Sequence, residues 1–134
     1  MESYQNFRKG NYVYIEGWSG PCQIEKEPGD ETYWILKSVI LSNSQYIQAG
    51  VDLTATIDEL KPIPVYGDDE LIKFGFFENN GLWVKNDFYI SKNFTSGFVV
   101  IKYFEKETEL TISFIHELQN LYFDKKGEKL EIKL

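Results

Sequence analysis

The longest helix pattern in the chain covers residues 115–126, and a stop signal and an alternating segment follow it directly. Five side chains recur there at three- and four-residue spacings, which places them on one helix face: Ile115, Leu118, Leu121, Tyr122 and Lys125. Gly127 favours the left-handed backbone that ends a helix, and residues 130–134 alternate with the period of a half-buried strand. We therefore expect a C-terminal helix that closes a core, followed by a final strand.

Turn residues divide the first half of the chain into short segments with the composition of β-strands. These segments are residues 11–16, 22–27, 32–41, 46–53 and 56–60. The last of them also fits a single helical turn. Five short strands at this spacing predict a small curled barrel. An alternating strand followed by Gly-x-x-Gly-Pro at residues 17–21 resembles the start of SH3-like barrels.

Two prolines mark an extended connector at residues 61–65, because each proline disfavours helical backbone in the residue before it. After this connector, Asp68 predicts the N-terminus of a short helix that runs through Phe74. Gly75 predicts the end of that helix. The connector thus separates two halves of the chain.

The second half predicts an antiparallel meander. Asn80-Gly81 is a strong hairpin signal, and strand-forming segments follow at residues 82–84, 88–91, 98–104 and 110–112. We expect the C-terminal helix to pack across this sheet. The predicted fold class is β-rich α+β: an SH3-like or small barrel lobe at residues 1–65, then an antiparallel sheet with one short and one longer helix at residues 66–134, in one compact unit.

The composition indicates a packed protein and excludes several functions. Of the 134 residues, 43% are hydrophobic and 16% aromatic, which is ample for the core of one domain. The formal net charge is −7, and no Lys or Arg cluster interleaves with aromatic residues, so we expect no direct contact with nucleic acid. No apolar run approaches the ~20 residues that span a bilayer, and the N-terminus lacks a secretory signal. We expect a cytoplasmic protein with no membrane partner.

Residues with catalytic or metal-binding chemistry occur singly. His116 is the only histidine, and the segment HELQN at residues 116–120 lacks the second histidine of a zinc-protease helix. Cys22 is the only cysteine, which excludes an internal disulfide and fits a core position. The acidic run at residues 68–70 fits a helix N-terminus. We expect no metal and no cofactor, while carboxylates distant in sequence leave an enzyme as one alternative.

Aromatic and polar side chains provide the candidate binding residues. Aromatic rings that flank turns or lie on predicted strands can anchor a partner: Trp18, Trp34, Trp83 and Tyr89. The C-terminal helix adds polar groups suited to a small ligand: His116, Gln119 and Asn120. A basic pocket for such a ligand would draw on four lysines: Lys73, Lys85, Lys92 and Lys102.

Three further segments can be compared with known sequences. They are LKPIP at residues 60–64, LIKFGF at residues 71–76, and HELQNLYF at residues 116–123 with GEKL at residues 127–130. In this order they resemble a group of small uncharacterised proteins from Bacteroidetes bacteria and their phages or prophages. The N-terminal half matches that group in pattern only. The resemblance implies a small accessory protein of a mobile element, and it implies no activity.

The leading functional hypothesis is a non-enzymatic protein-binding module that contacts a host or viral protein. One alternative is a small-ligand binder, for example a protein that sequesters a signalling nucleotide. Another alternative is a small enzyme that uses distant carboxylates. A homodimer is left open, because symmetric dimers are common among small proteins.

Overall fold

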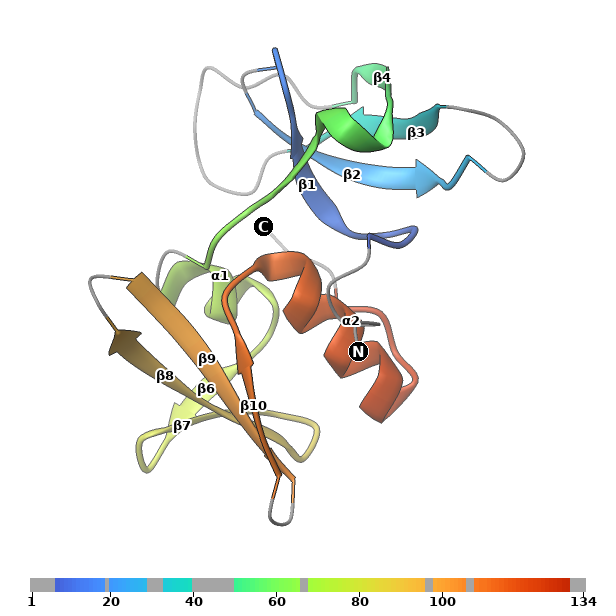
Figure 1. The fold of residues 1–134 in the computed structure, drawn as a ribbon. Coiled ribbons are helices and arrows are strands. Elements are labelled where there is room, and N and C mark those ends of the chain that lie inside the picture. Colours follow the sequence, from blue (N-terminus) through green and yellow to red (C-terminus); the bar gives the residue numbers. More distant parts are fainter. Residues whose placement is uncertain are drawn as a thin grey trace.

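The computed structural model describes residues 7–18, 20–28, 33–39, 50–65, 68–95, 98–105 and 108–130. Within these ranges it contains two antiparallel five-stranded sheets, two α-helices and one 3-10 turn. Figure 1 shows the two sheets one above the other, with both helices grouped around the second sheet. The β-rich α+β class predicted from the sequence is therefore confirmed.

The first sheet has the strand order β4-β3-β2-β1-β5. Its strands are β1 Tyr12–Ile15, β2 Pro21–Lys26, β3 Trp34–Ser38, β4 Asp52–Ala55 and β5 Leu60–Pro62. A 3-10 turn, η1 Ile57–Glu59, joins β4 to β5, so the helical alternative for this segment is correct. Pro62 lacks a backbone N–H, a loss that the edge strand β5 tolerates. We call this sheet, with η1, the first lobe.

The first lobe is an open sheet in the described part of the chain, because β4 and β5 lie at its two edges and no pairing there joins them. An SH3-like closed barrel therefore stays a prediction. Of the strand predicted at residues 46–53, residues 46–49 lie outside the described residues, and residues 52 and 53 belong to β4, which runs from Asp52 to Ala55. Residues 40–49 and 131–134, with the predicted final strand, lie outside the described residues.

The second sheet is a simple meander with the order β10-β9-β8-β7-β6. Its strands are β6 Phe77–Asn79, β7 Leu82–Lys85, β8 Phe88–Thr95, β9 Phe98–Glu105 and β10 Thr108–Ile112. Asn80 and Gly81 have φ of 55° and 85°, which matches the mirror-image turn of tight hairpins and confirms the Asn-Gly prediction. Asn86 and Asp87, at 50° and 64°, form a second turn of this hand. With both helices, this sheet forms the second lobe.

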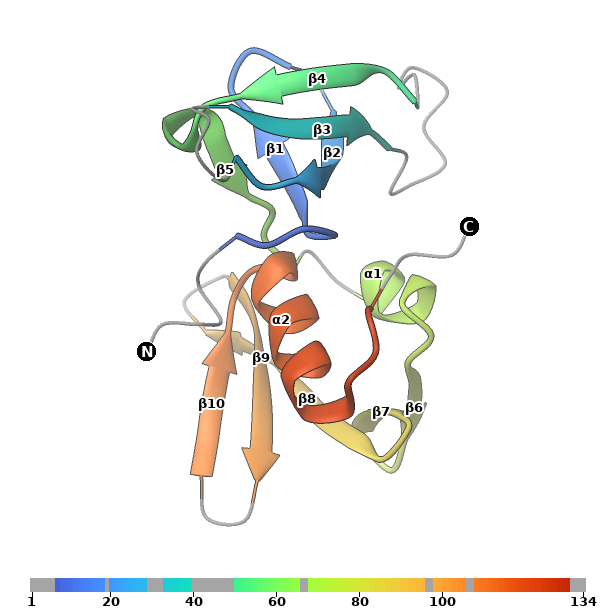
Figure 2. The same ribbon diagram turned by 90° about the vertical axis from the view of Figure 1, so that its right-hand side faces the viewer.

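Two helices accompany the second sheet, α1 Asp68–Lys73 and α2 Ile115–Lys126. Figure 2 shows α2 packed across one face of the strands β8 to β10. On its inner side Leu118, Leu121 and Tyr122 are fully buried, and the Tyr122 ring meets that of Phe88 edge-on at 5.1 Å. Gly127, with φ of 73°, ends the helix as predicted. The amphipathic pattern thus gave the correct helix and four of its buried residues, whereas Lys125 of the predicted face is exposed and the polar residues His116, Gln119 and Asn120 are buried as well.

The strand β1 contributes to both hydrophobic cores. Val13 and Ile15 point into the core of the first lobe, whereas Tyr12 belongs to the core around α2 and Tyr14 packs against it. Because side chains alternate along a strand, a single strand can serve two cores. Figure 2 shows the segment that leads into β1 passing between the first sheet and α2. The two lobes therefore meet at β1.

The proline-containing connector also joins the lobes. The backbone N–H of Ile115 donates to the carbonyl of Ile63 at 2.8 Å, and that of Val65 donates to Ser113 at 3.1 Å. Ile63 and Val65 are both buried in the core of the second lobe. The connector is therefore extended, as predicted, and it pairs with the segment that starts α2.

Neither helix within the described residues is long and apolar enough to cross a membrane. The longer one, α2, has 12 residues.

Candidate functional site

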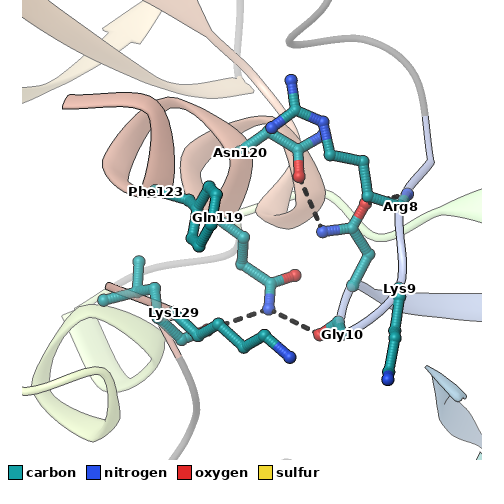
Figure 3. A pocket seen from close by; sticks show the side chains of 9 residues that line it. Arg8, Lys9, Gly10, Gln119, Asn120, Phe123 and Lys129 are labelled. Carbon is teal, nitrogen blue, oxygen red and sulfur yellow. Dashed lines mark hydrogen bonds between the residues drawn. The ribbon is translucent and has the colours of Figure 1, made fainter. Parts of the chain in front are cut away.

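A pocket of ≈100 Å³ lies where the two lobes meet. Three segments line it: residues 8–11 before β1, residues 119–123 of α2, and residues 129–130 after α2. Figure 3 shows these side chains around the carbonyl of Gly10. The pocket therefore depends on contacts between parts of the chain that are far apart in sequence.

Gln119 forms the floor of the pocket and is only 5% exposed. Its side-chain oxygen accepts a hydrogen bond from the backbone N–H of Tyr12 at 2.9 Å. Its Nε2 donates to the carbonyls of Gly10 at 3.0 Å and Leu130 at 2.9 Å. Oε1 and both Nε2 hydrogens thus have hydrogen-bond partners within the protein. Gln119 therefore shapes the pocket and does not need a ligand to complete its hydrogen bonds.

Asn120 makes the second polar contact between the lobes. Its Oδ1 accepts a hydrogen bond from Nδ2 of Asn11 at 2.8 Å, and both residues are buried. Oδ1 of Asn11 in turn accepts from the backbone N–H of Arg8 at 2.7 Å, which fixes the turn at residues 8–11. Because this turn is fixed, the basic residues 8 and 9 are held at the pocket.

Three cations line the pocket, although the protein as a whole carries a net charge of −7. Arg8 forms a two-pronged ion pair with Asp124, with N–O distances of 2.9 and 3.3 Å. Lys9 and Lys129 form no ion pair with any carboxylate of the described residues. The pocket is therefore a local positive region on an acidic protein.

An acid that does not line the pocket, Glu27, contacts the backbone of Lys9, and Gly10 leaves space beside Lys129. The carboxylate of Glu27 accepts a hydrogen bond from the backbone N–H of Lys9 at 3.2 Å. Gly10 has φ of 93°, and a Cβ built on it would lie 4.0 Å from Cδ of Lys129. The aliphatic part of Lys129 thus passes close to Gly10, and in Figure 3 the Lys9 and Lys129 side chains end on the same side of it.

Phe123 supplies an apolar wall. It follows Gln119 by one helical turn and its ring stands beside that side chain in Figure 3. It is 44% exposed, whereas its neighbours Leu121 and Tyr122 are fully buried. The pocket therefore combines ammonium groups with an uncovered aromatic ring.

The structure brings together only two of the residues that the sequence proposed for binding, Gln119 and Asn120. Trp34 and Trp83 are buried in the cores of the first and second lobes, at 9% and 6% exposure. Trp18 is half-buried against the first core. Most of the tryptophan surface is therefore used for packing.

Two further candidates lie elsewhere. His116 is buried, and its ring lies 4.6 Å from that of Phe7 and 6.1 Å from that of Phe114. Tyr89 is 45% exposed and lies on the face of the second sheet opposite to Phe88 and Ile90, which are buried with α2. Neither residue lines the pocket.

The lysines that the sequence suggested for a basic pocket do not line this one, among the described residues. Lys85 donates a hydrogen bond to the carbonyl of Phe74 at 2.6 Å and lies over the Tyr122 ring at 5.5 Å. Lys102 pairs with Glu109 at 3.1 Å. The cations of the pocket, Arg8, Lys9 and Lys129, were not predicted, since they lie at opposite ends of the sequence and no local pattern joins them.

The described residues offer few reactive groups. Burial raises the pKa of Cys22 to about 11, so its thiol stays protonated near neutral pH. Within the same residues no group of three or more His, Cys, Asp or Glu side chains is arranged to hold a metal ion.

The chain matches no protein-family model, and comparisons with curated proteins and with solved structures yield no match either.

Proposed function

We propose that the protein is a non-enzymatic binding protein whose pocket at the junction of the lobes takes a small anionic ligand. The observation that carries this proposal is the placement of Lys9 and Lys129 at one pocket without a carboxylate partner among the described residues. Both side chains are exposed, so water and salt screen their attraction for an anion and each ammonium group contributes modestly, but two of them at one pocket can act on the same anion. A protein that is acidic as a whole but places basic residues at one pocket can bind an anion at that pocket.

The lining of the pocket favours binding over catalysis. The side chains that form it are amides, cations and apolar groups: Arg8, Lys9, Asn11, Gln119, Asn120, Phe123, Lys129 and Leu130. The nearby carboxylate of Asp124 is engaged by Arg8. Apart from the two lysines, this set contains no side chain that commonly acts as a general base or a nucleophile.

The test is a thermal-shift and calorimetric titration of the full chain with inorganic phosphate, pyrophosphate and citrate. We expect at least one of them to raise the melting temperature in a concentration-dependent way, since a ligand that binds only the folded state stabilises it. Loss of one contact with an exposed ammonium group costs roughly 1 kcal/mol, so Lys9→Ala and Lys129→Ala should each weaken binding about fivefold. Binding should also weaken as salt is added.

Lys61→Ala is the matched control, because Lys61 is exposed on β5 and does not line the pocket. It removes the same charge and should leave the affinity unchanged. The proposal fails if none of the three anions distinguishes the wild type from the Lys9→Ala, Lys129→Ala double variant.

A second candidate function is binding of a host or viral protein through the outer face of the second sheet. Phe77, Leu82 and Tyr89 are 57%, 36% and 45% exposed. Val84 pairs with both Phe77 and Tyr89 in the strand register, so Phe77, Val84 and Tyr89 lie in one row across β6, β7 and β8, with Val84 itself only 7% exposed. Leu82 lies two residues before Val84, on the same face of β7. Apolar rings grouped on an outer face are typical of protein-contact surfaces.

This candidate is tested with Phe77→Ser and Tyr89→Ser, which remove exposed rings and leave the buried face intact. A protein captured from host cells by the wild type should be lost with the variants, and should bind the wild type again in purified form by calorimetry. A captured protein that binds both variants as tightly as the wild type would contradict a role for this face.

The remaining expectations from the sequence stay part of the proposal. They are the origin in Bacteroidetes or their phages, the cytoplasmic location, the homodimer and an SH3-like barrel in the first lobe. The return of β5 to pair with β1 after η1 supports the last of these.

A further inference from the structure

We infer that the pocket takes a phosphate monoester that carries a planar ring, with the phosphate at Lys9 and Lys129 and the ring against Phe123. This inference rests on the proposed function and goes further by naming the chemical class of the ligand. It assigns one role to the cations and another to the aromatic wall.

The volume of the pocket limits which part of the ligand can lie inside it. A volume of ≈100 Å³ is well below the roughly 300 Å³ at which sites for drug-sized ligands begin. It has room for a compact group such as a phosphate, and not for a whole nucleotide. The rest of a larger ligand must therefore lie at the mouth of the pocket.

Phe123 decides what kind of group fits at that mouth. Phe123 lines the pocket and is 44% exposed, although the two residues before it in α2, Leu121 and Tyr122, are fully buried. Aromatic rings stack on planar bases with little dependence on which base is present. A planar ring on the ligand would cover this apolar surface while its phosphate reaches the ammonium groups.

Gln119, at the floor of the pocket, favours a ligand whose anionic group binds at the entrance over one whose base inserts deeply. The hydrogen-bonding groups of Gln119 are engaged by Tyr12, Gly10 and Leu130. Reading the edge of a base would require free donors and acceptors there. We therefore expect binding that depends on phosphate and ring and that discriminates weakly between bases.

The experiment compares adenosine 5′-monophosphate, ribose 5-phosphate and adenosine by calorimetry on the full chain. We expect adenosine monophosphate to bind about tenfold tighter than ribose 5-phosphate, because one stacked ring contributes that order of affinity. Adenosine should bind far more weakly than either. Guanosine and cytidine monophosphates should lie within a few-fold of adenosine monophosphate.

Variants of the aromatic wall make the comparison specific. Phe123→Leu should abolish the tenfold advantage of adenosine monophosphate and leave the affinity for ribose 5-phosphate unchanged, while Phe123→Trp should retain it. Phe77→Leu is the matched control, since it removes an exposed ring that does not line the pocket.

The outcomes separate this inference from the proposed function. Equal affinity for adenosine monophosphate and ribose 5-phosphate, with both weakened in Lys9→Ala, overturns the ring site and leaves an anion site in place. Binding of adenosine as tight as that of its monophosphate overturns the phosphate site. A tenfold advantage that survives Phe123→Leu overturns the role of Phe123.

Discussion

The side-chain oxygen of Gln119 accepts a hydrogen bond from the backbone N–H of Tyr12 at 2.9 Å, which ties α2 of the second lobe to β1 of the first. The amide nitrogen of the same side chain holds Gly10 and Leu130. One buried residue thus joins three segments: α2, residues 10–12, and Leu130 after the helix. The pocket exists because these three segments are held together.

Replacement of Gln119 by leucine should destabilise the protein by about 3 kcal/mol, since it leaves the N–H of Tyr12 and the carbonyl of Leu130 without this partner, while the carbonyl of Gly10 keeps its hydrogen bond from Gln23. Urea denaturation measures the change. Gln23→Leu is the control, because Gln23 makes one hydrogen bond to Gly10 and is only half-buried, and it should cost about 1 kcal/mol. Equal losses for the two variants would contradict a special role for Gln119.

Glu117 should make stability depend on pH. Burial raises the pKa of its carboxyl group above the ordinary value of 4.5, against the lowering effect of hydrogen bonds from the N–H groups of Ser113 and Phe114. The folded state therefore holds this proton to a higher pH than the unfolded state. Its contribution to the free energy of unfolding is largest below 4.5 and falls as pH rises through the folded-state pKa.

The measurement compares the wild type with Glu117→Gln, which keeps a side-chain oxygen to accept the two hydrogen bonds. The stability of the wild type minus that of the variant should decrease between about pH 4 and about pH 7. A difference that is flat or rises over this range would show that burial does not control this carboxyl group.

The thiol of Cys22 should be unreactive in the native protein. It is fully buried, and its pKa of about 11 leaves almost no thiolate at pH 8. A chromogenic disulfide reagent should label the native protein at least a hundredfold more slowly than the same protein in denaturant, on the order of the loss in thiolate and access. Rapid labelling without denaturant would contradict this burial.

Gly127→Ala should destabilise the protein by about 1 kcal/mol. Gly127 has φ of 73°, and a Cβ at this position would meet nothing within 4 Å, so the cost comes from backbone conformation alone. Gly127→Asn should cost less, because asparagine tolerates left-handed backbone better than alanine. A larger loss for asparagine than for alanine in thermal unfolding would argue against this cause.

The elements that depend on local chemistry were predictable from the sequence. The spacing of Leu118, Leu121 and Tyr122 identified the buried face of α2, because a helix repeats every 3.6 residues wherever it packs. Asn80-Gly81 identified a hairpin, since few residues other than asparagine and glycine adopt the positive φ that its turn requires. These features do not require knowledge of distant contacts.

The candidate site was predicted only in part. Gln119 and Asn120 were selected as polar groups on the last helix, and both line the pocket. Trp34 and Trp83 were selected as rings that could anchor a partner and are buried, because a small domain with two cores uses its largest side chains for packing. The exposure of a side chain depends on which other segments pack over it, and the residues next to it in sequence do not specify those segments.

The sequence by itself determined the short strands, the two helices and the turns that separate them, because propensity, periodicity and positive φ act within a few residues. Only the tertiary structure decided that β1 serves two cores and that Lys9 and Lys129 share one pocket with Phe123. These contacts join segments from the two ends of the chain. Their geometry follows from the docking of α2 against β1, through buried amide hydrogen bonds that no local pattern predicts.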